Sequence, residues 1–99
     1  MVVMVDIHEE KIKIGKKFGA SEVLINDSTL DNKLKSISEY GFDIIIDATG
    51  LTKICEQLFK YINKNGRIMF FGLCDKEENI NINPYQIFKN DLTILELFL

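Results

Sequence analysis

Short runs of apolar residues alternate along this chain with longer amphipathic stretches, and this alternation limits the choice of fold more than any other feature. The runs are rich in β-branched and aromatic residues and lack polar alternation, which is typical of strands covered on both faces. Strands that alternate with helices form a parallel sheet between helical layers. We therefore predict a three-layer α/β fold with five strands, at residues 2–5, 23–25, 44–46, 68–71 and 92–98.

Two helices are expected in the first half of the chain. Residues 9–18 begin with acidic side chains and end with lysines before a glycine, which suits the helix dipole and a glycine C-cap. The inward-facing residues of this helix would be Ile12, Gly15 and Phe18. A second helix, residues 31–40, has an apolar stripe that starts at Leu30 and recurs at helical spacing. His8 follows the first strand, where it would start the helix rather than bind a metal.

Two further helices are expected in the second half. One starts with Thr52 as N-cap and ends before a turn at Asn65. Its inward-facing residues would be Ile54, Leu58, Tyr61 and Ile62. The other, residues 83–90, has Asn83 as N-cap, a proline at the first helical position, and Gln86, whose side chain would reach back to the cap.

Charge and hydropathy narrow the classes of partner. Twelve basic and fifteen acidic residues give a net charge of -3 without a Lys/Arg cluster, so we expect no nucleic-acid partner. The apolar runs are far shorter than the ~20 residues that span a bilayer, so we expect no membrane partner and a cytoplasmic location. Cys55 and Cys74 suit neither a zinc site nor a disulfide scaffold, so we expect reduced packing residues and no metal site.

The candidate binding residues are those that follow each apolar run, because sites in parallel sheets lie at the carboxyl ends of the strands. Asp6 follows the first run and could accept hydrogen bonds from both hydroxyls of an adenosine ribose. Asp6 could equally stabilise the next helix, because its negative charge would lie near the positive N-terminal end of the helix dipole. Lys11 could approach the same ribose, or it could be a solvated helix lysine.

Small residues follow the third and fourth runs. Ala48, Thr49 and Gly50 would let a flat ring approach the backbone closely, and Gly72 would do the same after Phe71. Each of these glycines is equally well explained as a turn residue.

Several segments combine into a recognisable pattern in the right order and at the right spacing. They are residues 6–12, 17–20, 42–50, 65–68, 71–72 and 82–94. Together they resemble the zinc-type medium-chain alcohol and polyol dehydrogenases, and the last segment resembles the sorbitol and threonine dehydrogenase-like branch. The resemblance implies that residues 1–99 are a partial NAD(P)-binding Rossmann domain, a fragment of the cofactor-binding domain of an NAD-dependent dehydrogenase.

On the adenosine side, the resemblance implies a role for five residues. Asp6 would hold the ribose and favour NAD over NADP, because its negative charge would meet a 2′-phosphate. Lys11 would support the same sugar. Ile7 and Thr49 would flank the adenine, with Ala48 beside them.

On the nicotinamide side, Phe71, Gly72 and Leu73 would pass beneath the ribose and the carboxamide. The family's first strand and its G-x-G-x-x-G turn, which receives the pyrophosphate, would precede Met1. The family's zinc ligands also have no counterpart in this chain, so zinc would belong to the full-length family only. We therefore expect the chain to be inactive alone, with NAD binding weak or lost. Glu96 departs from the family, which usually has a glycine there.

The resemblance also bears on the order of the strands. The family's full order is 3-2-1-4-5-6, and the strand before Met1 would be the central one. If the remaining strands close the gap, they take the order 2-1-3-4-5, with residues 2–5 hydrogen-bonded to residues 44–46. The last strand, residues 92–98, would be an apolar edge through which two copies pair, so we expect a homo-oligomer.

Two other interpretations stay open. An S-adenosylmethionine-dependent methyltransferase core also has an acid after its second strand, but it would continue through a longer helix than residues 82–94 provide. A non-catalytic truncated product that binds nothing is compatible with the same family.

Overall fold

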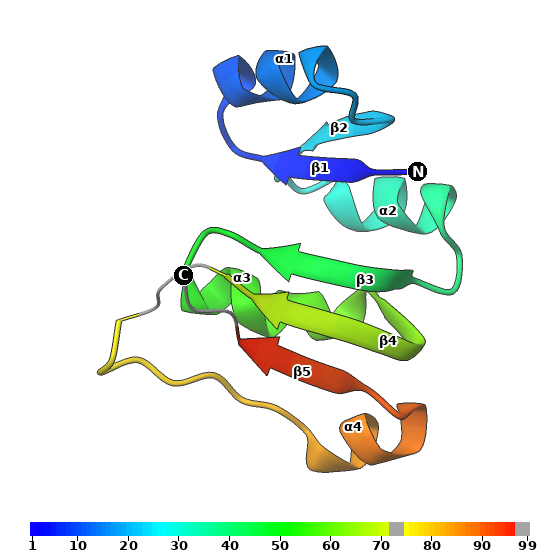
Figure 1. Ribbon diagram of the computed structural model, residues 1–99, viewed down its shortest axis with the longest axis vertical. Coiled ribbons are helices and arrows are strands. Elements are labelled where there is room, and N and C mark those ends of the chain that lie inside the picture. The colour runs from blue at the N-terminus through cyan, green and yellow to red at the C-terminus, as the bar shows by residue number, and fades with distance from the viewer. Residues whose placement is uncertain (72–74, 97–99) are drawn as a thin grey trace. The chain divides into compact units, whose positions relative to one another are not determined.

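The computed structural model describes residues 1–71 and 75–96, which fall into two compact units, Met1–Glu39 and Tyr40–Leu99 (Figure 1). Strands and helices alternate through both units. Every described strand pair is parallel. The predicted α/β class with five strands is therefore confirmed. None of the described helices is long and apolar enough to cross a bilayer.

The first unit contains one strand–helix–strand connection and a further helix. Its elements are β1 (Val3–Asp6), α1 (Glu9–Lys17), β2 (Glu22–Ile25) and α2 (Leu30–Ile37). β1 and β2 form a two-stranded sheet in which Val3 lies opposite Glu22 and Asp6 lies opposite Ile25. α1 begins with acids and ends with lysines, as the dipole argument predicts.

α1 buries Gly15 but not Phe18. A Cβ at Gly15 would collide with the side chain of Met4, so the glycine permits close packing of the helix on β1. Phe18 is 82% exposed. The predicted inward position of Phe18 is wrong, because the helix ends at Lys17 and Phe18 is its C-cap residue.

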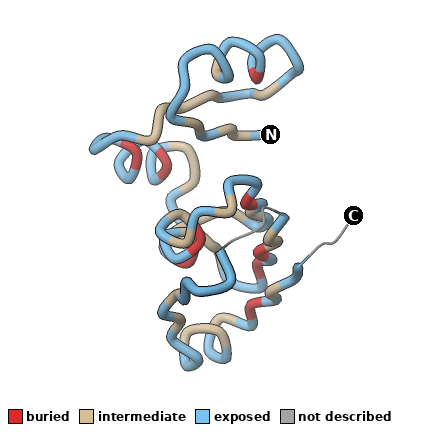
Figure 2. The backbone as a smooth tube through the Cα atoms, turned by 90° about the vertical axis from the view of Figure 1, so that its left-hand side faces the viewer, coloured by how far each residue is buried: buried red, intermediate tan, exposed pale blue. Residues whose placement is uncertain are grey.

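α2 ends earlier than predicted. Ser38 takes an extended conformation directly after Ile37, so the helix does not continue to Tyr40. Leu30 and Leu34 are both buried, as their spacing predicts, and they provide the apolar side of this short helix (Figure 2).

The second unit contains a three-stranded sheet of order β3-β4-β5. Its elements are β3 (Phe42–Asp47), α3 (Thr52–Gln57), the 3₁₀ turn η1 (Leu58–Lys60), β4 (Ile62–Phe70), α4 (Pro84–Asn90) and β5 (Thr93–Glu96). The register places Ile45 opposite Ile68, which lies opposite Ile94. These three isoleucines share one face of the sheet, because registered partners in a parallel sheet point the same way.

The core of the second unit forms on that face. Phe59, Ile68 and Leu92 are buried, and Ile68 has no exposed surface. On the opposite face, Ile44 and Ile46 are 58% and 60% exposed. The prediction that this strand is covered on both faces is therefore wrong.

The helical segment before β4 buries different residues from those predicted. Cys55 and Phe59 are its buried side chains. The predicted inward set is only partly buried, namely Ile54, Leu58, Tyr61 and Ile62. The buried side of the segment is one residue along from the predicted one, since Cys55 and Phe59 each follow a predicted inward residue. The helical segment also ends at Lys60 rather than just before Asn65, and Ile62 is already the first residue of β4.

The helix starts are partly as predicted. Asn83 is the N-cap of α4, and its side chain accepts a hydrogen bond from the Tyr85 N–H at 2.9 Å. Gln86 does not reach back to this cap, because its side chain bonds to the Phe59 carbonyl instead. Thr52 is not the N-cap of α3: Leu51 holds that position, and the Thr52 hydroxyl donates to the Glu78 carboxylate.

The predicted strand order 2-1-3-4-5 is not confirmed. Among the described strands, β1 is hydrogen-bonded to β2, and β3 to β4, so the strands form two sheets rather than one. The predicted last strand is observed at Thr93–Glu96; Leu92 lies just before it, and residues 97 and 98 lie outside the described part of the chain.

Candidate functional site

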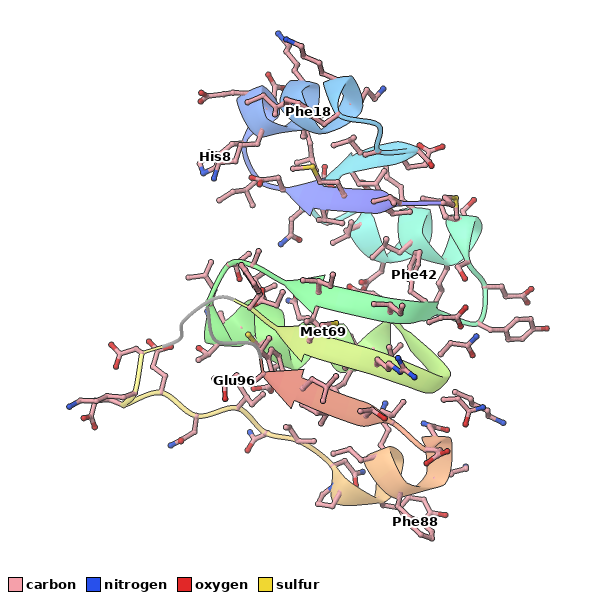
Figure 3. All side chains as sticks on the ribbon, viewed as in Figure 1. His8, Phe18, Phe42, Met69, Phe88 and Glu96 are labelled. Atoms are coloured by element: carbon pink, nitrogen blue, oxygen red, sulfur yellow. The ribbon has the colours of Figure 1, made fainter. Side chains whose placement is uncertain are left out.

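The first group of candidate residues lies where β1 ends and α1 begins. The side chain of Asp6 accepts a hydrogen bond from the His8 N–H at 2.9 Å, and its backbone carbonyl accepts one from Asn26 at 3.0 Å. His8 is the N-cap residue of α1, as predicted, but its side chain makes no cap hydrogen bond (Figure 3). Asp6 thus forms a local turn before the helix rather than capping the helix itself.

The groups around Asp6, between β1 and α1, favour the ionised form of its carboxyl group. The His8 N–H holds the pKa of Asp6 below its usual range, and the charge of Lys11 acts in the same direction. Ile7 is 61% exposed and Lys11 is also exposed, one turn into α1. A fixed carboxylate therefore lies beside an exposed apolar side chain and an exposed ammonium group.

The second group lies at the carboxyl end of β3. Ala48 and Thr49 are exposed, while Asp47 before them is only 2% exposed. Gly50 follows with a φ of 68°, a left-handed conformation that suits glycine. This conformation suits a turn residue, which is one of the two interpretations given for Gly50, and the loop presents Ala48 and Thr49 to solvent.

The end of β4 joins this second group through the backbone. The Phe71 N–H donates to the Asp47 carbonyl at 2.8 Å, which places Phe71 beside the start of the loop. Phe71 is 45% exposed. The predicted positions Gly72 and Leu73, together with Cys74, lie outside the described residues.

The structure thus arranges the described candidates in two groups. Asp6, Ile7 and Lys11 lie in the unit of residues 1–39, whereas Ala48, Thr49 and Phe71 lie in the unit of residues 40–99. Within each unit the candidates lie at the carboxyl ends of parallel strands, where ligand sites of open α/β sheets form.

Sequence reasoning missed the part that Asp47 plays. It treated Asp47 only as the first residue of a segment of small residues, but the buried carboxylate accepts four hydrogen bonds from the loop and from α3. An acid followed two residues later by a threonine is a local signal for such a turn, and it could have pointed to this role.

The whole chain, residues 1–99, matches a family model described as a zinc-binding dehydrogenase. The chain belongs to the zinc-binding dehydrogenase family. The resemblance stated from the sequence is confirmed, and the methyltransferase interpretation is wrong.

Two curated relatives show which zinc-binding dehydrogenases are similar to this chain. The D-altritol 5-dehydrogenase of Agrobacterium fabrum is 27% identical over 94 residues, which are 95% of this chain and 26% of the relative. The L-threonine 3-dehydrogenase of Caldanaerobacter subterraneus is 36% identical over 80 residues, which are 78% of this chain and 23% of the relative. The chain therefore spans about a quarter of the length of these relatives.

Solved structures of dehydrogenases share the fold. A zinc-binding dehydrogenase from Sinorhizobium meliloti bound to NADP superimposes with a TM-score of 0.87 at 18% identity, covering 99% of this chain and 30% of that one. An alcohol dehydrogenase from E. coli complexed with NADH gives a TM-score of 0.83 at 21% identity, covering 96% and 28%. The chain thus corresponds to part of the Rossmann-like cofactor-binding domain of a zinc-type alcohol dehydrogenase.

The family name raises the question of whether zinc fits this chain. Among residues 1–71 and 75–96, no three His, Cys, Asp or Glu side chains come together in a way that could hold a metal ion. Cys55 is a buried thiol that donates to the Asp47 carboxylate at 3.3 Å. The described residues therefore do not fit a zinc ion, and we assign them no metal chemistry.

Proposed function

We propose that this chain contributes the adenosine-binding part of the cofactor site in an NAD-dependent alcohol or polyol dehydrogenase. The observation that carries the proposal is the carboxylate of Asp6, held at the end of β1 by the His8 N–H at 2.9 Å. A carboxylate at this position of a dinucleotide-binding sheet suits the two hydroxyls of an adenosine ribose. When bound, NAD accepts a hydride from the alcohol, and residues of this chain only bind and orient it.

The charge of Asp6 supports NAD rather than NADP as the cofactor. Its pKa is lowered chiefly by the His8 N–H, so the carboxylate is ionised at neutral pH. A 2′-phosphate at the same ribose would bring a second negative charge next to it, which like-charge repulsion disfavours. Lys11 offsets part of this repulsion, so we propose a preference and not an absolute selection.

The remaining site residues are proposed from their positions at strand ends. In the first unit Ile7 is proposed to contact the adenine. In the second unit the same contact is proposed for Thr49 and Ala48, and Phe71 would lie beneath the nicotinamide ribose. Ile7, Thr49 and Phe71 are exposed at the ends of β1, β3 and β4, which supports their access to a ligand. The same roles are proposed for Gly72 and Leu73 from the sequence alone.

We propose that the 99-residue chain has no dehydrogenase activity alone and binds NAD with millimolar affinity or weaker. Its six glycines include no G-x-G-x-x-G turn, so a pyrophosphate would lack that source of backbone donors. The test is a titration of the ¹⁵N-labelled chain with NAD, followed by amide chemical shifts. Shift changes centred on Asp6, Ile7 and Thr49 are expected. A micromolar dissociation constant, or changes confined to other residues, would count against the proposal.

We also propose that two copies associate through β5. This strand is the edge of the β3-β4-β5 sheet, and Leu95 on it is 41% exposed. Unpaired backbone groups at a strand edge readily pair with a second chain. Sedimentation should show dimers that Leu95→Lys disrupts, whereas a monomer at high protein concentration would contradict the idea.

A further inference from the structure

We infer that Asp47 is a positioning residue for the nucleotide: its buried carboxylate holds the loop of Ala48, Thr49 and Gly50 in the conformation that receives the ligand. This inference rests on the proposed function, because it assigns a support to the loop that would contact the adenine. Asp47 would not touch the ligand itself, since only 2% of its surface is exposed.

Both oxygens of this carboxylate are engaged by donors of the protein. Oδ1 accepts hydrogen bonds from the Thr49 hydroxyl at 2.6 Å and from the Thr49 N–H at 3.2 Å. Oδ2 accepts from the Gly50 N–H at 3.2 Å and from the Cys55 thiol at 3.3 Å. Each carboxylate oxygen therefore bonds to a residue of the loop, Oδ1 to Thr49 and Oδ2 to Gly50. The Cys55 thiol bonds to Oδ2 as well, which attaches α3 to the same carboxylate.

The backbone of Asp47 makes a second connection. Its carbonyl oxygen accepts the Phe71 N–H at 2.8 Å, so the same residue also holds the start of the segment after β4. Thr49 and Phe71 come from different strands, and both belong to the proposed nucleotide site. Asp47 thus connects the loop after β3 with Phe71 at the end of β4.

The connection matters for binding because the loop is small and exposed. Ala48 and Thr49 have little packing of their own, so without the carboxylate they would sample several backbone conformations. Ordering them would then oppose binding, whereas a loop already held in place avoids this entropy cost. The Thr49 hydroxyl also accepts the Leu51 N–H at 3.1 Å, which closes the turn after Gly50.

Two substitutions of Thr49 separate positioning from simple contact. Thr49→Val keeps the branched shape that would touch an adenine but removes the hydroxyl that bonds to Asp47. Thr49→Ser keeps the hydroxyl and removes the methyl group. If Asp47 positions the loop through this hydroxyl, Val should weaken binding by more than Ser does. If Thr49 contributes only an apolar surface, the order should be reversed.

The experiment titrates adenosine 5′-monophosphate against the ¹⁵N-labelled 99-residue chain and its variants. Thr49→Val is expected to raise the dissociation constant about fivefold, the equivalent of one net hydrogen bond, while Thr49→Ser stays within about twofold. Thr49→Val should also lower the unfolding midpoint, because it removes a hydrogen bond to the buried Asp47 carboxylate, so all titrations are run well below the midpoint of every variant. A Val variant that binds as tightly as wild type would overturn the inference.

Asp47→Asn gives a second measurement, with Asp43→Asn as its matched control. Asp43 lies on the same strand but is exposed and accepts only a bond from the Asn63 side chain at 3.3 Å. Asp47→Asn should weaken binding by more than Thr49→Val and speed amide exchange at Thr49 and Gly50, whereas Asp43→Asn should change neither. If Asp47→Asn does not fold, the Thr49 pair decides the question.

The outcomes distinguish the two ideas. If the wild-type chain produces no shift changes with the nucleotide, the proposed function fails and this inference fails with it. If the wild-type chain binds and the Thr49→Val and Asp47→Asn variants bind equally well, the proposed function stands and only the positioning role of Asp47 is overturned.

Discussion

The side-chain amide of Gln86 donates a hydrogen bond to the backbone carbonyl of Phe59 at 2.9 Å and so joins α4 to the end of η1 across 27 positions of the chain. Phe59 is one of the buried core residues of the second unit. α4 has no buried residue of its own, so this polar contact is a specific attachment of the helix to the core.

Gln86→Ala should therefore destabilise the chain by about 1 kcal/mol, the typical net value of one intramolecular hydrogen bond. The free energy of unfolding would be measured by urea titration. Gln57→Ala is the matched control, because Gln57 is an exposed glutamine at the end of α3. Equal losses in both variants would show that the contact with Phe59 contributes nothing.

Asp6→Asn should abolish the preference for NAD over NADP. The substitution keeps the shape of the side chain and removes the charge that would repel a 2′-phosphate, so the two dissociation constants should converge. Chemical-shift titrations with each cofactor measure this. Asp27→Asn serves as the control, because Asp27 makes a similar local turn with the Thr29 N–H at 2.8 Å. An unchanged preference in Asp6→Asn would remove Asp6 from the site.

Acid should destabilise the first unit through Asp6 and Asp27. Hydrogen bonds from the His8 N–H and from the Thr29 hydroxyl, respectively, are the largest causes that lower the pKa of these carboxyls. Since the folded pKa lies below the unfolded one, this stabilisation is present above about pH 4 and is lost as the pH falls through the folded pKa.

The corresponding measurement compares wild type with Asp27→Asn at pH 7 and at pH 3. The variant should unfold at a lower temperature than wild type at pH 7, and the difference should be smaller at pH 3, where protonation of the carboxyl in the unfolded chain already removes part of the stabilisation. A difference that does not change with pH would show that the charge of Asp27 has no part in stability.

Ile68→Val should cost about 0.5–1.5 kcal/mol, because it removes a methyl group from a fully buried position and leaves a small cavity. Ile44→Val is the control: Ile44 lies in the same sheet but is 58% exposed, so little should change. Unfolding by denaturant measures both. If the two variants lose the same stability, Ile68 is not at the centre of the core.

Features that depend on near neighbours in the chain could be predicted from the sequence. Asn83 caps α4 because a short polar side chain can reach an N–H two residues ahead, and Leu30 and Leu34 are buried because helical spacing places them on one side. The position of Asp6 at the end of β1 follows from the length of the apolar run before it. For such features the interacting residues lie within about one helical turn of each other.

Features that depend on partners far along the chain could not be predicted in this way. The periodicity of the helical segment after Gly50 does not show that Cys55 and Phe59 are its buried residues, because the stripe one position earlier is equally apolar. Nor does a capping pattern reveal that the side chain of Gln86 finds a carbonyl on another element. In both cases a local rule competes with a tertiary contact, and the tertiary contact decides.

The sequence by itself determined the α/β class, the order of the elements and the family, because these depend on the alternation of apolar runs and on the spacing of short motifs. Only the tertiary structure decided which strands pair, which face of β3 is covered, and how Asp47 is used. Burial of that carboxylate depends on donors from Thr49, Gly50 and Cys55 converging on one point, and such convergence is a property of three-dimensional packing.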